Sequence, residues 1–226
     1  MRCVLPTVTA LTVLVAVPHA ALPPTGTIVG RVVLTARIKG SGLPSTVYQP
    51  RSVTIHRHST TPDISNVVVS LRGAPFSGPL PIAHGEIRQV HEEFLPRVLA
   101  VTKGSIVDFP NSDPIFHNVF SLASAASFDL GRYPQGHSKS ATLTKAGIVK
   151  VYCHIHSEMS ATILVLDHPY FTTPEIDGTF RLTGVPPGTY AIVGWHERVG
   201  ERVTSITVTA GTTTAVALSL PIEDET

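Results

Sequence analysis

The residues best suited to chemistry lie in one short segment that contains Cys153, His156 and Met159. After residue 21 the chain holds one cysteine and one methionine, and His156 stands midway between them. A second imidazole is available upstream at His117, in the sequence FHNV. A thiolate and two imidazoles in a trigonal arrangement, with a weak axial thioether, form a ligand set that copper uses for electron transfer. The pattern therefore predicts one mononuclear copper site per chain, bound by His117, Cys153, His156 and Met159.

Each of these residues also has an alternative interpretation. Cys153 could be a buried small hydrophobe, the common environment of a free cysteine, and His117 could be a polar residue at a strand end. The axial bond is weak and is sometimes supplied by another atom, so Glu158 competes with Met159 for that position. His154 follows Cys153 directly and should point to the opposite side of the strand, which predicts that it is not a ligand.

At these positions the chain resembles the cupredoxins, amicyanin and plastocyanin in particular. The resemblance lies in the spacing of Cys153, His156 and Met159 and in the upstream His-Asn-Val that begins at His117. It implies a type 1 (blue) copper site in a Greek-key β-sandwich, a role in one-electron transfer, and a redox partner protein. It also implies that Asn118 ties the two ligand loops together, as groups that orient metal ligands do.

The chain departs from this family at Ile155, where amicyanin and plastocyanin have proline before the second histidine. Isoleucine has a backbone N–H and proline does not. An Ile155 amide aimed at the Cys153 sulfur would stabilise the thiolate and favour Cu(I). On that reading, proline at this position would lower the reduction potential.

The elements that position these residues are expected to be strands. The 17 glycines and 19 prolines are scattered between short Val-, Ile- and Thr-rich runs, a pattern typical of an all-β sandwich or barrel. Residues 98–102, 105–109, 147–152 and 161–166 are the predicted strands around the site. Val149, Val151 and Cys153 alternate with exposed positions, so the thiolate should project into the core.

The remaining strands predict a second β-sandwich. Residues 26–37, 66–71, 177–182, 185–192 and 206–211 resemble the carboxypeptidase regulatory-like, transthyretin-type sandwich, with the middle of the chain separating its two halves. We therefore expect an all-β protein in which a cupredoxin sandwich is inserted into, or fused with, a regulatory-like sandwich. Domain termini often lie close together, which makes insertion tolerable. The expected division is 1–21 signal peptide, 22–83 and 169–226 regulatory-like sandwich, and 84–168 cupredoxin domain.

The N-terminal segment indicates where the protein acts, and the overall charge indicates which class of partner it lacks. Residues 1–21 combine Arg2, a short apolar run and a small-residue exit, which predicts a signal peptide and a periplasmic or secreted protein. The mature chain contains no run long and apolar enough to cross a bilayer. Lys and Arg total 17 against 16 acidic residues, so no nucleic-acid partner is expected.

The predicted function is a one-electron carrier and not an enzyme. A copper-binding or delivery protein without redox turnover is the alternative. A carbohydrate-binding or adhesion module with an auxiliary copper domain is a third, since Trp195 and Tyr190 could stack on a sugar. His56 and His58 could bind a second metal, but a solvated pair of surface residues is the simpler interpretation.

Overall fold

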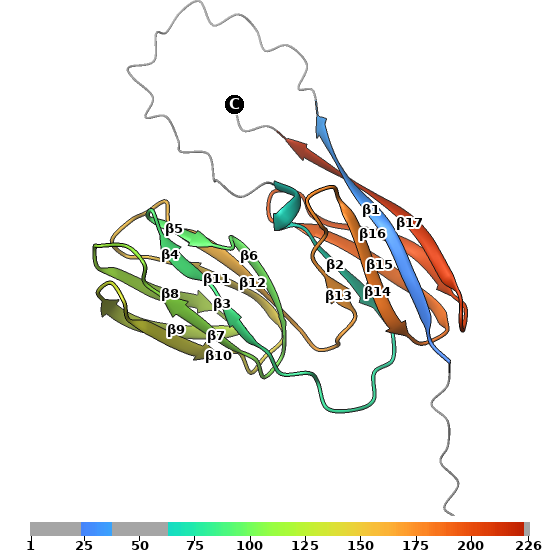
Figure 1. Cartoon of the computed structure of the whole chain (residues 1–226), viewed down its shortest axis with the longest axis horizontal. Helices are drawn as coiled ribbons and strands as arrows, with labels where there is room; N and C mark the ends of the chain where they lie inside the picture. Colours follow the sequence, from blue (N-terminus) through green and yellow to red (C-terminus); the bar gives the residue numbers. More distant parts are fainter. Residues whose placement is uncertain (1–23, 38–62, 224–226) are drawn as a thin grey trace, which may run out of the picture.

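Figure 1 shows a computed structural model of the chain, which describes residues 24–37 and 63–223. The predicted signal peptide and the His56–His58 pair lie outside the described residues. The second described range opens with a short 3-10 helix, η1 Asp63–Asn66.

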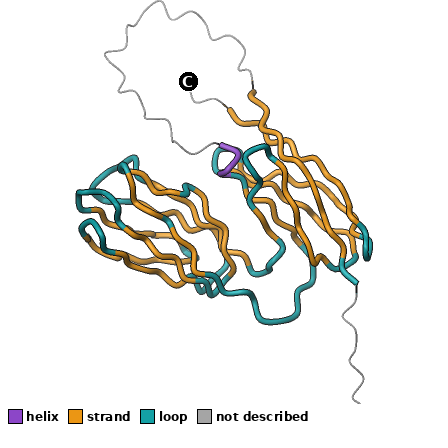
Figure 2. The backbone as a smooth tube through the Cα atoms, viewed as in Figure 1, coloured by secondary structure: helices purple, strands orange, loops and turns teal. Residues whose placement is uncertain are grey.

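The described residues are otherwise built from strands and their connecting turns (Figure 2), which confirms the all-β prediction. One group of strands, the middle sandwich, comprises β3 His84–Glu86, β4 Arg88–Val90, β5 Glu93–Leu95, β6 Val98–Thr102, β7 Ile106–Pro110, β8 His117–Ala123, β9 Ala126–Tyr133, β10 Ser138–Thr142, β11 Gly147–Tyr152 and β12 Ser160–Leu166. The other group, the split sandwich, comprises β1 Gly26–Arg37, β2 Val68–Arg72, β13 Phe171–Thr172, β14 Thr179–Val185, β15 Gly188–His196, β16 Gly200–Val208 and β17 Thr213–Glu223.

The middle sandwich carries all the predicted metal ligands. Its sheets have the orders β10-β7-β3 and β6-β12-β11-β8-β9, and β4 and β5 form a separate hairpin. β11 and β8, which lead to the ligands, are neighbours in the larger sheet. Val149 and Val151 are buried with Cys153 in the core between the sheets, so the predicted alternation along β11 is confirmed.

The split sandwich joins the two ends of the chain. Its sheets have the orders β14-β1-β17 and β13-β2-β15-β16. β1 runs antiparallel to β14 and parallel to β17, and β2 pairs with β13 and β15. Both N-terminal strands therefore pair with C-terminal ones, as an inserted middle segment requires. Among the sheets of the described residues, none combines strands of both sandwiches. The domain boundaries at residues 84 and 168 stay predictions.

The end of the split sandwich differs in detail from the expectation. Residues 206–211 were expected to form the closing strand, but β16 ends at Val208 and a turn follows. The closing strand is β17, which pairs in parallel with β1 along that strand's length. A parallel pair joins distant segments of chain, so local patterning gives no sign of it.

A small apolar cluster packs the two sandwiches together. Val98 and Leu164 of the middle sandwich meet Val68 and Trp195 of the split sandwich in this cluster. Trp195 is therefore a core residue, and Tyr190 is buried in the separate core of the split sandwich. These two rings do not form the exposed stacking platform that a sugar site at these positions would need.

Glu197, which follows β15, adds a polar contact at the same boundary. Its side chain is 13% exposed, with one oxygen 2.5 Å from Arg97 Nε and the other 3.4 Å from Lys150 Nζ. Thr162 accepts a hydrogen bond from Lys150 at 2.8 Å and so orients that ammonium group. Burial alone would raise the pKa of Glu197. The charges and hydrogen bonds of Arg97 and Lys150 together lower it by more than burial raises it, so the pKa lies below its ordinary value.

Glu197→Gln should therefore weaken the packing of the two sandwiches at neutral pH. We expect a loss of unfolding free energy on the order of 1–2 kcal/mol, between the values for exposed and buried ion pairs. Because the folded-state pKa is depressed, this stabilisation is present above the ordinary Glu pKa of about 4.3 and is lost as the pH falls below it. Chemical denaturation of wild type and variant between pH 7 and pH 3 measures the difference.

The matched control is Glu201→Gln, because the ion pair of Glu201 with Arg72 is exposed and lies within the split sandwich. That change should cost less than about 1 kcal/mol. A Glu197→Gln protein as stable as wild type at neutral pH, or a difference that does not shrink on acidification, would contradict the assigned role of Glu197.

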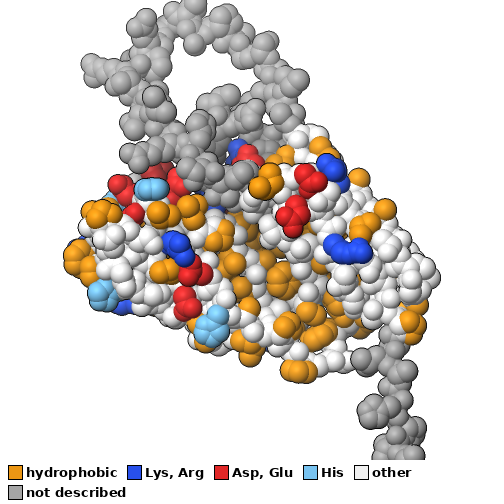
Figure 3. All heavy atoms as spheres, viewed as in Figure 1, with side chains coloured by type: hydrophobic (Ala, Val, Ile, Leu, Met, Phe, Trp, Pro, Cys, Tyr) orange, Lys and Arg blue, Asp and Glu red, His pale blue; other side chains and the backbone are white. Residues whose placement is uncertain are grey.

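The surface carries few charges. On the face seen in Figure 3, charged side chains stand singly or in small groups among neutral and hydrophobic ones, as expected from a charged fraction of 15%. In the part of the chain that the structure describes, no helix is long and apolar enough to span a membrane.

Candidate metal centre

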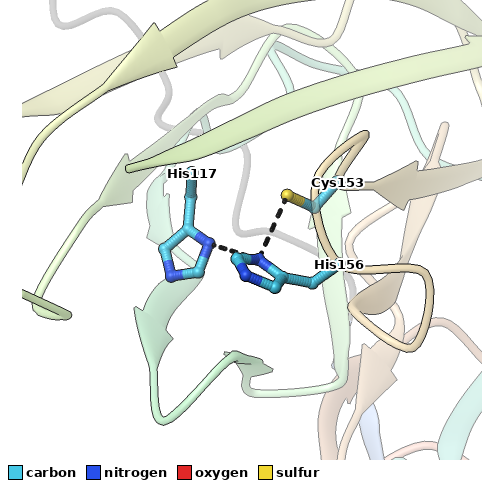
Figure 4. A group of neighbouring side chains, drawn as sticks. All are labelled: His117, Cys153 and His156. Carbon is cyan, nitrogen blue, oxygen red and sulfur yellow. Dashed lines mark hydrogen bonds between the residues drawn. The ribbon is translucent and has the colours of Figure 1, made fainter. Parts of the chain in front are cut away.

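Three of the four predicted ligands meet at one end of the middle sandwich (Figure 4). His117 begins β8, Cys153 follows β11 directly, and His156 lies in the loop before β12. Their potential ligand atoms all lie within 4.8 Å of one another. The two imidazoles approach through Nδ1, at 3.1 Å, and Cys153 Sγ lies 3.9 Å from His156 Nδ1. Two neighbouring strands and one loop thus deliver three donor atoms to a common point.

The spacing of the donor atoms suits a single small ion. An ion bound to nitrogen at about 2.0 Å and to sulfur at about 2.3 Å, with ligand angles of about 110–120°, needs donor atoms roughly 3.3–3.8 Å apart. The separations of 3.1 and 3.9 Å between neighbouring donors bracket this range. The third pair, His117 and Cys153, lies within 4.8 Å, so the three donors would have to draw closer together to complete the coordination. Their types, one thiol and two imidazoles, fit a metal ion.

The loop from Cys153 to Met159 is closed by its own backbone. The Cys153 amide donates to the Met159 carbonyl at 3.3 Å, and the Met159 amide donates to the His156 carbonyl at 3.1 Å. Cys153 is 5% exposed and His117 is fully buried, whereas His156 is only half-buried. The site therefore lies beneath the surface, with one imidazole near solvent.

Met159 is buried in the same core cluster as Cys153, at 1% exposure. Glu158, its competitor for the axial position, is exposed. A buried thioether is the better placed of the two to approach a buried metal, because the Glu158 carboxylate would first have to give up its hydration. The axial role of Met159 stays a prediction.

His154 and Asn118 lie beside the centre without joining the donor group. The His154 ring is exposed and contacts Phe120 of β8, with ring centroids 3.7 Å apart and the ring planes tilted by 39°. The His154 amide donates to Asn118 Oδ1 at 3.3 Å, and Asn118 Nδ2 donates to Asp129 at 2.7 Å. Asn118 thus connects the loop of Cys153 to the strand of His117, as the resemblance implied.

The expectation for Ile155 needs correction. Among the hydrogen bonds of the described residues, none runs from the Ile155 amide to the Cys153 sulfur, and the Ile155 side chain is 38% exposed. The sulfur instead has the His156 ring nitrogen as its polar neighbour. The loop backbone therefore orients this amide elsewhere, and Ile155→Pro is not expected to act by removing a hydrogen bond to sulfur.

Sequence reasoning missed Asp113, whose carboxylate lies 2.7 Å from His117 Nε2. Burial raises the pKa of Asp113, but hydrogen bonds from the Glu92 amide, the His117 ring and the His91 amide lower it more. The pKa therefore lies below its ordinary value and the group is a carboxylate at neutral pH. The signal was available in the run Asn111-Ser112-Asp113-Pro114 before His117, but the partners of Asp113 come from a distant turn.

A second polar network lies next to His117 on the neighbouring strand, β9. Tyr133 pairs with His117 across β8 and β9, and its hydroxyl donates to the Phe109 carbonyl at 2.8 Å. Gln89 Nε2 donates to that hydroxyl at 2.6 Å. Burial raises the pKa of Tyr133, so the phenol is neutral. This network fixes the strand that backs His117 without adding charge to the site.

Comparison with solved structures finds cupredoxins. A purple cupredoxin from Nitrosopumilus maritimus matches with 19% identity and a TM-score of 0.33, over 36% of this chain and 99% of its own. A variant of amicyanin in its reduced Cu(I) form matches with 20% identity and a TM-score of 0.35, over 43% of this chain and 98% of its own. A copper-containing nitrite reductase from Thermus scotoductus has 26% identity and a TM-score of 0.35, over 42% of this chain and 24% of its own.

Comparison with family models finds a different likeness for the C-terminal part. Residues 154–216 match the model of polysaccharide lyase family 4, domain II, which is less than a third of the chain. The predicted likeness to the carboxypeptidase regulatory-like sandwich stays a prediction. Among curated proteins, none matches the chain. The assignment of a metal therefore depends on the side chains of the site itself.

Proposed function

We propose that this protein binds one copper ion through His117, Cys153 and His156, with Met159 as the weak axial ligand, and carries single electrons. One observation supports this above all. A cysteine sulfur and two imidazole nitrogens converge within 4.8 Å at the buried end of a β-sandwich. A copper ion held by this donor set alternates between Cu(I) and Cu(II).

The chain's own residues would keep the site rigid and dry. His117 and Cys153 extend from neighbouring strands of one sheet, and both are buried. The backbone hydrogen bonds between Cys153, His156 and Met159 restrain the ligand loop. A cavity that changes little between the two charge states of an ion lowers the reorganisation that each electron transfer requires, and supplying that orientation is the protein's part in a redox site.

His156 is the proposed point of electron entry and exit, because it is the ligand nearest to solvent. Exposed apolar residues precede both histidines: Ile115 and Phe116 before His117, and Ile155 before His156. An apolar surface beside a partly exposed ligand suits brief contact with a redox partner protein, since electron-transfer complexes bury little area. That partner is an expectation of the proposed function.

The main rival is a copper-binding or delivery protein that does not exchange electrons. The same donor set could also hold zinc tetrahedrally. Within the described residues, His117, Cys153 and His156 are the one group of this kind, so we propose a carrier and not an enzyme with a second metal. Export to the periplasm or the outside of the cell follows from the predicted signal peptide and is part of this proposal.

Titration of the purified mature protein with Cu(II) tests the proposal. We expect one equivalent of copper to produce an intense visible band from thiolate-to-copper charge transfer. In a mixture of the Cu(I) and Cu(II) forms, NMR line broadening should then report fast electron self-exchange. A colourless complex or a site selective for zinc would refute the copper assignment. A coloured complex with slow self-exchange would favour the delivery protein.

A further inference from the structure

Asp113 is a buried carboxylate in direct contact with a proposed metal ligand. Its side chain is 6% exposed, and Oδ2 lies 2.7 Å from Nε2 of His117, which is fully buried. A carboxylate can only accept hydrogen bonds. A neutral His117 ring must therefore carry its hydrogen on Nε2, which leaves the Nδ1 lone pair facing His156 Nδ1 at 3.1 Å.

The turn between β4 and β5 is shaped around this carboxylate. The His91 amide donates to Asp113 Oδ1 at 2.6 Å, and the Glu92 amide donates to Oδ2 at 2.9 Å. Both turn residues have positive φ, 55° and 60°, a conformation that two-residue hairpin turns usually assign to Asn and Gly. Residues with side chains adopt it at a cost, which the surrounding structure must offset. The paired hydrogen bonds to Asp113 are one such compensation.

Asn111 fixes the other side of Asp113. Asn111 Oδ1 accepts a hydrogen bond from the Asp113 amide at 2.9 Å. Its Nδ2 donates to the carbonyls of Ile115 at 2.9 Å and Tyr133 at 3.1 Å. The loop from Asn111 to His117 is thereby tied to β9 as well as to the β4–β5 turn, so the carboxylate has little freedom to leave the imidazole.

Within residues 24–37 and 63–223, no lysine or arginine forms an ion pair with Asp113. Among the ion pairs of the described residues, its partner is His117. The other two groups that bind it are neutral backbone amides. In a buried site, charges interact more strongly than in water. The charge therefore acts through the imidazole on whatever ion Nδ1 binds, and it favours the more positive of two oxidation states.

We propose that Asp113 is a positioning residue that presents His117 to the metal through Nδ1 and stabilises Cu(II) relative to Cu(I). This inference rests on the proposed copper function. It assigns to the β4–β5 turn, which contains no ligand, the task of holding that carboxylate in place. Groups that hydrogen-bond to a ligating histidine fix its tautomer and orientation and raise its basicity.

The wild-type protein gives a readout of the positioning role that needs no variant. In the Cu(I)-loaded protein, which is diamagnetic, long-range proton–nitrogen correlation of the histidine rings identifies which His117 nitrogen carries hydrogen. We expect hydrogen on Nε2 and metal on Nδ1. Hydrogen on Nδ1, or copper bound through Nε2, would overturn the proposal.

Asp113→Asn tests the effect of charge on the copper. We expect the ratio of Cu(II) to Cu(I) affinity to fall about tenfold, the low end of the usual effect of losing such a partner. This corresponds to a rise of ~59 mV in the reduction potential, measured by protein-film voltammetry. The matched control is Glu92→Gln, which removes a charge from the same turn but leaves the Glu92 amide in place. Its side chain is exposed, so the control should shift the potential far less.

The outcomes separate this inference from the proposed function. Wild-type protein without a thiolate-to-copper band would refute the function itself. If the wild-type band is present and Asp113→Asn shifts the potential no more than Glu92→Gln does, the inference about Asp113 is wrong. If Asp113→Asn does not fold, the tautomer of His117 in wild-type Cu(I) protein decides.

Discussion

Replacing Cys153 with serine is expected to abolish the visible band of the copper-loaded protein. The band depends on charge transfer from thiolate to copper, and serine offers no thiolate. Copper affinity should fall by more than the roughly 10–100-fold that loss of a ligand's hydrogen-bond partner costs, because a ligand itself is lost. Absorption spectroscopy and competition with a chelator of known affinity measure both effects.

The neighbouring histidines provide a matched pair of controls for this experiment. His154 and His156 lie in the same loop, but only His156 belongs to the donor group. His156→Ala should lose the band, and His154→Ala should keep it. Circular dichroism of the metal-free variants checks that the all-β fold is retained. A folded Cys153→Ser protein that keeps the band would show that the colour comes from another site.

The part of the site that sequence alone could predict is the part that is local in the chain. Cys153, His156 and Met159 lie in one loop, so their spacing alone indicates a common site. Alternation along β11 was enough to predict that Cys153 points into the core, because side chains in a strand alternate with period two. The structure buries Val149, Val151 and Cys153 together.

The features that could not be predicted from the sequence depend on contacts between distant segments of the chain. Asp113 accepts hydrogen bonds from the His91 and Glu92 amides, which belong to a hairpin more than 20 residues upstream. The direction of the Ile155 amide depends on how the whole loop closes, and residue type does not specify it. The parallel pairing of β1 with β17 joins the two ends of the chain. No local pattern reports such a contact.

The same distinction explains the outcome for Trp195. A tryptophan at a strand end can stack on a sugar or fill a core, and its sequence neighbours do not separate these roles. In the structure Trp195 lies against Val98 and Leu164 of the other sandwich. Its environment is therefore decided by the packing of the two sandwiches, a relation that exists only in the folded chain.

Met159 combines two predicted roles that substitution can separate. Its side chain is 1% exposed within the core of the middle sandwich. Met159→Ala should therefore lower the unfolding free energy of the metal-free protein by about 2–5 kcal/mol, because it leaves a cavity. Met159→Leu conserves the volume and should cost less than about 1.5 kcal/mol. Chemical denaturation monitored by fluorescence measures both values.

The reduction potential then distinguishes an axial ligand from a residue of the core alone. Leucine fills the same space without a sulfur lone pair, so Met159→Leu would remove a weak donor that stabilises Cu(II). We expect the potential of Met159→Leu to rise by at least the ~59 mV that corresponds to a tenfold change in a one-electron equilibrium. The visible band should persist, since Cys153 and both histidines are unchanged. If the potential and the band of Met159→Leu match those of wild type while Met159→Ala is destabilised as expected, Met159 contributes to packing and the axial position belongs to another group.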